Sequence, residues 1–157
     1  MSKKALDQVD RTILATLQAN GRLSNAELAK QLGISAPPCL RRVRALEQAG
    51  FIKNYQANLN SELLGFGLTV FAFVGLSSQA EADLNAFAQQ VYLWPEVREC
   101  HMLSGEIDFI LKVVTKDLEA FQDFLSQKLL CAKHVETVKT SLTLKENFIK
   151  TKLPLSE

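Results

Sequence analysis

The segment from Ser24 to Gly50, SNAELAKQLGISAPPCLRRVRALEQAG, constrains the fold more than any other part of the chain. Ser24 with Glu27 three residues later is a capping box, which marks the start of a short helix with one apolar face. Gly33 closes that helix, and Ser35 stands at the start of a second helical pattern that ends at Gly50. Two helices joined by so short a glycine-containing turn predict a helix-turn-helix, preceded by one further amphipathic helix.

Two consecutive prolines, Pro37 and Pro38, open the second helix of this motif. Proline is tolerated there because the first N–H groups of a helix have no intrahelical acceptor, so we expect the helix to begin near these residues. The hydroxyl of Ser35 would ordinarily accept from N–H groups two and three residues on, and prolines have none. That hydroxyl is left for a DNA phosphate at the positive helix end or for solvent, and both alternatives stay open.

Three arginines follow within four residues. At 100° per residue, Arg41, Arg44 and Gln48 lie opposite the apolar side of the helix. The exposed side of this helix enters the major groove in helix-turn-helix proteins, so Arg41 and Arg44 are assigned to DNA. Arg42 lies at the flank and is assigned mainly to structure through a pair with an acid, with a phosphate contact as the alternative. The predicted DNA-binding residues are Asn25, Ser35, Ala36, Pro37, Pro38, Arg41, Arg42 and Arg44.

The charge is unevenly distributed along the chain. Residues 1–60 hold nine Lys or Arg and four Asp or Glu, a net charge of +5. Residues 61–157 hold nine Lys or Arg and thirteen Asp or Glu, a net charge of −4. This division favours two modules, of which the first has a polyanionic partner such as double-stranded DNA.

Composition argues against membrane and secreted classes. No run of about 18 apolar residues is present, and no apolar core of a signal peptide follows the first lysines, so no membrane partner is expected. The cysteines Cys39, Cys100 and Cys131 are odd in number and contain no C-x-x-C. We therefore expect reduced thiols and a cytoplasmic protein.

No set of residues predicts catalysis, a metal or a cofactor. Cys100 and His101 are adjacent in an expected strand, so their side chains point to opposite faces and cannot share a ligand. Glu106 and Asp108 form an acid pair without a cleft motif or a phosphate loop beside it. The chain is therefore not expected to be an enzyme.

The second module alternates strand and helix patterns. Strands are expected at residues 67–76, 97–103, 107–114 and 135–144, with one helix between the first two and another between the last two. This βαββαβ order predicts a ferredoxin-like domain and, with the helix-turn-helix, an α+β protein. The first and third strands are apolar on both faces, whereas two helices cover one face only. A second copy of the chain is the expected cover, and a symmetric pair would read two half-sites about one DNA turn apart, roughly 34 Å.

The stretch LSGEIDFILK, together with RLSNAELAKQLGISAPPCLRRVRALEQAGFI, resembles the leucine-responsive regulatory protein/AsnC (Lrp/AsnC, feast/famine) family. The resemblance extends from Leu6 to about Lys150, and the patterns SxxPCLxRVRxLExxGFI and ECHxxSGxxD are similar to its leucine-responsive branch. The Pro37-Pro38 pair and Glu106, at a position often held by aspartate, depart from the family pattern.

The resemblance implies three regions and a regulatory role. These are a (winged) helix-turn-helix domain at 1–50, a connector strand at 51–61, and a ferredoxin-like effector-binding and oligomerisation domain at 62–157. It also implies dimers that assemble further, commonly into octamers, with an amino-acid effector between dimers. Transcription would then respond to a small amino acid, with effector binding coupled to assembly and DNA affinity.

A local argument extends this implication to individual residues. The turn at Gly105 permits close backbone approach, and neighbouring N–H groups can hold a carboxylate while Asp108 holds an ammonium group. Apolar side chains beside them would select leucine or methionine. The predicted effector-binding residues are Met102, Leu103, Ser104, Gly105, Glu106, Asp108 and Leu142. An ordinary hairpin with a solvated acidic edge is the alternative for this loop.

The competing function is an amino-acid-sensing module that does not bind DNA, such as a regulatory subunit of an enzyme. The first 50 residues separate the two functions, because such a module has no need of a basic helix-turn-helix.

Overall fold

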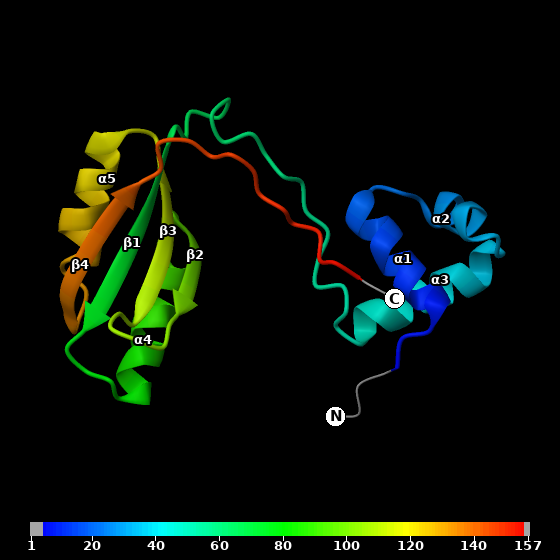
Figure 1. Ribbon diagram of the computed structural model, residues 1–157, viewed down its shortest axis with the longest axis horizontal. Helices are drawn as coiled ribbons and strands as arrows, with labels where there is room; N and C mark the ends of the chain where they lie inside the picture. Colours follow the sequence, from blue (N-terminus) through cyan, green and yellow to red (C-terminus); the bar gives the residue numbers. More distant parts are fainter. Residues whose placement is uncertain (1–4, 156–157) are drawn as a thin grey trace. The chain divides into compact units, whose positions relative to one another are not determined.

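The computed structural model describes residues 5–155 and divides into two compact units (Figure 1). The first unit runs to Asn58 and takes in the C-terminal segment from Phe148, and the second is Leu59–Asn147. The predicted domain at 62–157 thus loses its last residues to the first unit, because Leu155 packs against the core of that unit. The outer ends of the predicted domains, residues 1–4 and 156–157, lie outside the described residues.

Three helices build the first unit: α1 Gln8–Ala19, α2 Asn25–Leu32 and α3 Ala36–Gln48. Side chains cap the first two of these helices. The Asp7 side chain accepts from the N–H of Asp10 at 2.7 Å, and the capping box of α2 is formed in both directions. The α2–α3 turn bends at Gly33, which has a φ of 65° that glycine adopts without strain. The apolar sides of the helices meet in a core of Ile13, Leu14, Leu28, Ala29, Cys39 and Leu46.

The connector does not form the predicted strand. Residues 52–60 have no regular hydrogen-bonded structure, and residues 61–65 form turns. A strand needs a neighbour for its ladder of hydrogen bonds, and the described chain provides none beside this segment.

The second unit contains β1 Leu68–Leu76, α4 Glu81–Tyr92, β2 Val97–Met102, β3 Phe109–Thr115, α5 Leu118–Phe124 and β4 Val135–Leu142. A π-helical turn, Leu125–Leu129, continues α5. The four strands form one antiparallel sheet in the order β2-β3-β1-β4, with β1 and β3 at its centre (Figure 1). This arrangement confirms the ferredoxin-like prediction.

The two faces of the sheet differ in burial. Val70, Ala72 and Val74 of β1 are fully buried, and they share one core with Phe87 of α4 and Phe121 of α5. The alternate residues of the central strands are only half-buried. We call this second side the open face; its apolar residues are Phe71, Phe73, Ile110 and Val114.

A buried carboxylate joins two loops at one end of the sheet. Asp108 is 7% exposed, and its Oδ2 accepts from the N–H of Leu76 at 2.7 Å. Its Oδ1 accepts from Nε2 of Gln79 at 2.8 Å, while its own N–H donates to the carbonyl of Val74 at 2.9 Å. Asp108 therefore fastens the β2–β3 loop to the segment that leaves β1.

Replacing Asp108 with alanine is expected to lower the free energy of unfolding of the second unit by about 1–3 kcal/mol, because the buried N–H of Leu76 loses its acceptor. Chemical denaturation followed by the fluorescence of Trp94 reports on this unit, since Trp94 packs against Phe87 and Phe124. Glu106→Ala, in the same loop but exposed, is the matched control and should change stability by less than about 0.5 kcal/mol. Equal effects of the two variants would contradict the role given to Asp108.

Candidate functional site

The outer side of α3 carries the candidate nucleic-acid interface. Arg41 and Arg44 are exposed there, three residues apart on one helix face, and within residues 5–155 neither makes an ion pair. They border a shallow depression lined by Pro37, Leu40, Arg41, Arg44, Ala45 and Gln48. Two free guanidinium groups beside a shallow apolar strip suit a phosphate backbone and base edges.

Arg42 is held inside the unit. Its Nη1 lies 2.7 Å from Oδ2 of Asp7 and 2.9 Å from Oδ1 of Asp10. Hydrogen bonds to these two carboxylates raise the pKa of Arg42. Because Asp10 is only 2% exposed, the pair fastens α3 to the start of α1. Arg42 thus has the structural pairing expected from its flank position, and a phosphate would have to compete with two carboxylates for it.

The start of α3 differs by one residue from the prediction. The helix begins at Ala36 with Ser35 as its N-cap, so that Pro37 and Pro38 occupy the second and third helical positions. The Ser35 side chain makes no capping hydrogen bond, because neither proline offers an N–H. Its exposed hydroxyl therefore lies at the positive end of α3 with its bonding capacity unused by the cap.

Asn25 lies at the junction of the two helices of the motif. Its Nδ2 donates to the carbonyl of Ala36 at 2.9 Å, which ties the first turn of α2 to the first turn of α3. Asn25 is therefore a positioning residue in this structure. Its half-buried side chain sets where the start of α3 points.

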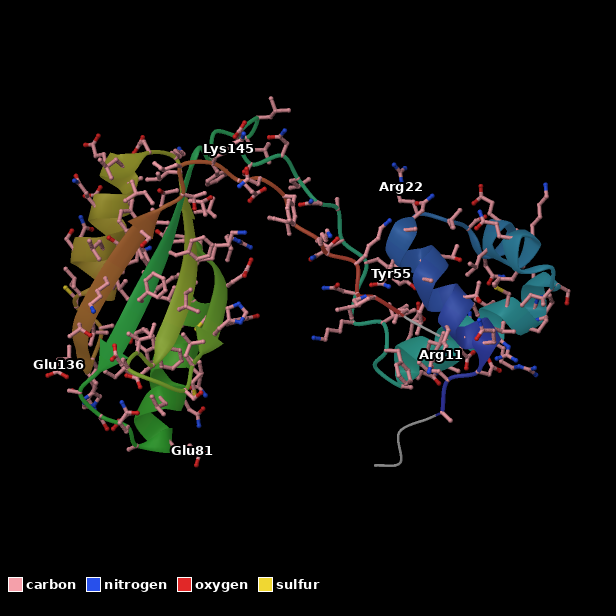
Figure 2. The ribbon with its side chains drawn as sticks, in the orientation of Figure 1. Arg11, Arg22, Tyr55, Glu81, Glu136 and Lys145 are labelled. Atoms are coloured by element: carbon pink, nitrogen blue, oxygen red, sulfur yellow. The ribbon has the colours of Figure 1, made fainter. Side chains whose placement is uncertain are left out.

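Sequence patterns did not identify Leu40 or Tyr55 as parts of this region. Leu40 is 38% exposed although apolar, and it borders both the depression on α3 and a second hollow that Tyr55 also lines. Tyr55 is labelled in Figure 2. Its hydroxyl donates to Oε1 of Glu47 at 3.0 Å, and burial, followed by this bond, raises the pKa of Tyr55 to about 12. Tyr55 thereby anchors the connector on α3, a long-side-chain contact that local periodicity does not reveal.

The loop between β2 and β3 exposes backbone N–H groups. The N–H of Leu103 donates to the carbonyl of Asp108 at 2.8 Å and closes the loop. Gly105 has a φ of 150°, a conformation that a side chain would strain. In the part of the chain that the structure describes, the N–H groups of Ser104, Gly105 and Glu106 donate to no other atom, and all three residues are exposed. They are available to a carboxylate.

Asp108 and Leu142 have contacts that bear on their predicted roles in this loop. Each carboxylate oxygen of Asp108 accepts one hydrogen bond from the chain, so Asp108 holds the loop in place, and its bond to an ammonium group stays a prediction. Leu142 pairs with Val70 on one edge of the sheet, whereas Met102 pairs with Phe109 on the other. Two strands and four residues along the sheet separate them, roughly 20 Å, so one chain does not bring Leu142 to the loop.

Three further features concern metal sites, disulfides and membrane-spanning helices. Among residues 5–155, no three His, Cys, Asp or Glu lie close enough together to hold a metal ion. In the same residues the three cysteines are free thiols. No helix over the described range is long and apolar enough to cross a membrane.

Both units match known families. Residues 6–53 match the winged helix-turn-helix DNA-binding family, and residues 69–153 match the Lrp/AsnC ligand binding domain. The leucine-responsive regulatory protein of Rhizobium meliloti (strain 1021) is 51% identical over 141 residues, which cover 90% of each chain. That of Escherichia coli (strain K12) is 41% identical over 143 residues, or 91% of this chain and 87% of the relative.

Solved structures agree with these matches. A Neisseria meningitidis transcriptional regulator in complex with L-methionine has a TM-score of 0.89 and 40% identity, covering 96% of this chain and 97% of that one. Escherichia coli AsnC has a TM-score of 0.86 and 28% identity, with coverage of 96% and 99%. The similarities confirm the DNA-binding and amino-acid-binding domains and the expectation of a regulator in place of an enzyme. The chain therefore belongs to the Lrp/AsnC family of transcriptional regulators.

Proposed function

We propose that this protein regulates transcription by reading a specific DNA sequence with α3, and that a small aliphatic amino acid changes its assembly and its DNA affinity. The observation that carries the proposal is that three neighbouring arginines differ in exposure and in ion pairing. Arg42 is tied to Asp7 and Asp10, while Arg41 and Arg44 are exposed and unpaired within residues 5–155. A module without a nucleic-acid partner has no use for that arrangement, which argues against an amino-acid sensor that does not bind DNA.

Leucine or methionine is the proposed effector. Met102 and Leu103 are 51% and 39% exposed beside the unbonded N–H groups of the β2–β3 loop, so a carboxylate and an aliphatic side chain can both be accommodated. The names of the relatives, and the L-methionine bound by the Neisseria regulator, support this class of ligand. A Leu142 side chain could join such a site only from another copy, which favours an effector held between subunits.

The open face of the sheet is the proposed dimer interface. Its apolar residues stay half-buried in a single chain, and Lys112 lies among them opposite Phe71; they are Phe71, Phe73, Ile110 and Val114. A second copy would cover it by two-fold symmetry and would pair two α3 helices for two half-sites. Dimers are proposed to assemble further into an octamer. The interfaces between dimers would then be the places where an effector binds.

Effector coupling requires only a modest energy. A ligand that binds one assembly state better by about 1–3 kcal/mol changes DNA affinity roughly 5- to 150-fold. The protein is proposed to act in the cytoplasm, where DNA is present and free thiols such as those of Cys100 and Cys131 stay reduced.

Arg44→Ala is expected to weaken DNA binding and to reduce the slope of log affinity against log salt by about 0.9, the share of one phosphate. Fluorescence anisotropy with a labelled duplex over a series of salt concentrations measures the slope. Lys116→Ala removes the same charge from the second unit and should leave the slope unchanged. An unchanged slope for Arg44→Ala would remove this residue from the DNA contacts.

Met102→Ala is expected to weaken leucine or methionine binding roughly fivefold, because about 1 kcal/mol of apolar contact is lost. Calorimetric titration with each amino acid measures the affinity. Leu118→Ala is the matched control, since Leu118 is 50% exposed on α5 and Met102 is 51% exposed. An affinity that is the same in both variants would place the effector away from this loop.

Phe73→Asp is expected to convert the protein to single chains at micromolar concentration, because the substitution places a carboxylate on the face that the proposed interface would bury. Sedimentation velocity measures the distribution. Tyr92→Asp, at an 88% exposed position on α4, should keep the wild-type distribution. If Phe73→Asp still formed dimers, the open face would not be the interface.

A further inference from the structure

Two apolar residues lie on the face of α3 that carries the exposed arginines. Leu40 is 38% exposed and borders the depression that Arg41 and Arg44 also line. Pro37 stands three residues earlier, so it shares a side of the helix with Leu40; it is exposed and borders the same depression. We call Pro37 and Leu40 the proline–leucine patch. Contacts to phosphates alone would not require apolar side chains at this place.

The proline–leucine patch offers no side-chain hydrogen-bonding group. Both side chains are hydrocarbon, and the ring of Pro37 also replaces its backbone N–H. A polar base edge pressed against the patch would lose water without gaining a partner, which costs free energy. In the major groove, the C5-methyl group of thymine is the apolar group that the four bases present. The patch is therefore suited to thymine and unsuited to the other base edges.

Both residues of the patch lie where a helix-turn-helix reaches bases. The second helix of this motif places its N-terminal residues against base edges in the major groove. In α3, which begins at Ala36, Pro37 is the second residue and Leu40 the fifth. The patch therefore occupies the part of α3 that contacts bases and not only the backbone.

The patch is restricted in motion before DNA is present. Most of the surface of Leu40 is covered within its own unit, and Leu40 also borders the hollow lined by Val43 and Tyr55. The side chain of Pro37 is a closed ring. Side chains that are already restricted lose little conformational entropy when they contact a ligand, so a small apolar contact can still contribute to affinity.

We propose that the proline–leucine patch reads the C5-methyl group of a thymine, which makes Pro37 and Leu40 specificity-determining residues for DNA. The inference rests on the proposed reading of DNA by α3 and adds a base identity to it. Arginine contacts to phosphates position the protein without distinguishing sequences. The patch distinguishes thymine from cytosine and from both purines.

Deoxyuridine tests the proposal in the unaltered protein, because it lacks only the C5-methyl group of thymidine and pairs in the same way. The probe is a duplex that the full-length wild-type protein selects from random sequence, with its thymines replaced one at a time. At one or more positions the replacement should weaken binding roughly three- to fourfold, the share of one buried methyl group. Fluorescence anisotropy at fixed salt measures each affinity.

Variants assign the methyl contact to the patch. Leu40→Ala should bring the ratio of affinities for the thymine and deoxyuridine duplexes close to one, because both changes remove the same contact. Pro37→Ala should lower the ratio part of the way, and alanine suits a helix at this position. Leu153→Ala makes the same substitution as Leu40→Ala at a residue bonded to Gln18 of α1, and should keep the wild-type ratio.

The ratio for one preparation does not depend on how much of the protein is folded. If Leu40→Ala bound neither duplex, Pro37→Ala would carry the test. A wild-type protein indifferent to every deoxyuridine would overturn the proposal, and so would an unchanged ratio in both variants, which would place the methyl contact elsewhere. A wild-type protein that bound no duplex at low salt would instead reject the proposed reading of DNA, and this inference with it.

Discussion

The ion pair between the buried carboxylate of Asp10 and the guanidinium of Arg42 sets the orientation of α3 in the DNA-binding unit. An unpaired charge at 2% exposure would be strongly destabilising, so Arg42 must point inward from α3. Helical geometry then turns Arg41 and Arg44 outward, because residues one and two positions away lie on other sides of the helix. The orientation of the reading face is thus a consequence of a pairing on its rear side, reinforced by the bond from Asn25 to Ala36.

A comparable constraint acts on the sheet unit. Its central strands are apolar on both sides, while the core with the helices is built by alternate residues such as Val70 and Leu111. The side that carries Phe73 and Ile110 stays half-exposed, and apolar area of that kind favours association. Asp108 adds order at one end of this sheet by fixing the loop whose N–H groups are free. The outer side of α3, the β2–β3 loop and the open face are therefore built by different elements of one chain.

Local patterns predicted much of this arrangement. The capping box at Ser24, the apolar stripes of the helices and the alternation in β1 depend on neighbours within a few residues, and the structure has them all. Contacts over long separations were not predictable in the same way. Asp108 finds its partners 29 and 32 residues away, and the distance of Leu142 from the loop follows from strand order and register. Periodicity does not encode which edge of a sheet a strand joins.

The connector and the C-terminal segment illustrate the same difference. Residues 51–61 are expected from the sequence to form a strand, but within residues 5–155 they pair with no other strand. No local pattern singles out Gln18 or Leu153, and only the fold shows that the Gln18 side chain bonds the backbone of Leu153. Sequence patterns thus indicate which elements form, while tertiary structure decides which distant residues become neighbours.

The return of the chain to its first unit also imposes an order of events during biosynthesis. A nascent polypeptide emerges from its N-terminus, and the three helices can gather as soon as they leave the ribosome. Leu155 reaches their core only after all of Leu59–Asn147 has been translated. A partly made chain can therefore contain a folded helix-turn-helix whose core still lacks Leu155, and this last packing contact forms only after the second unit has been translated.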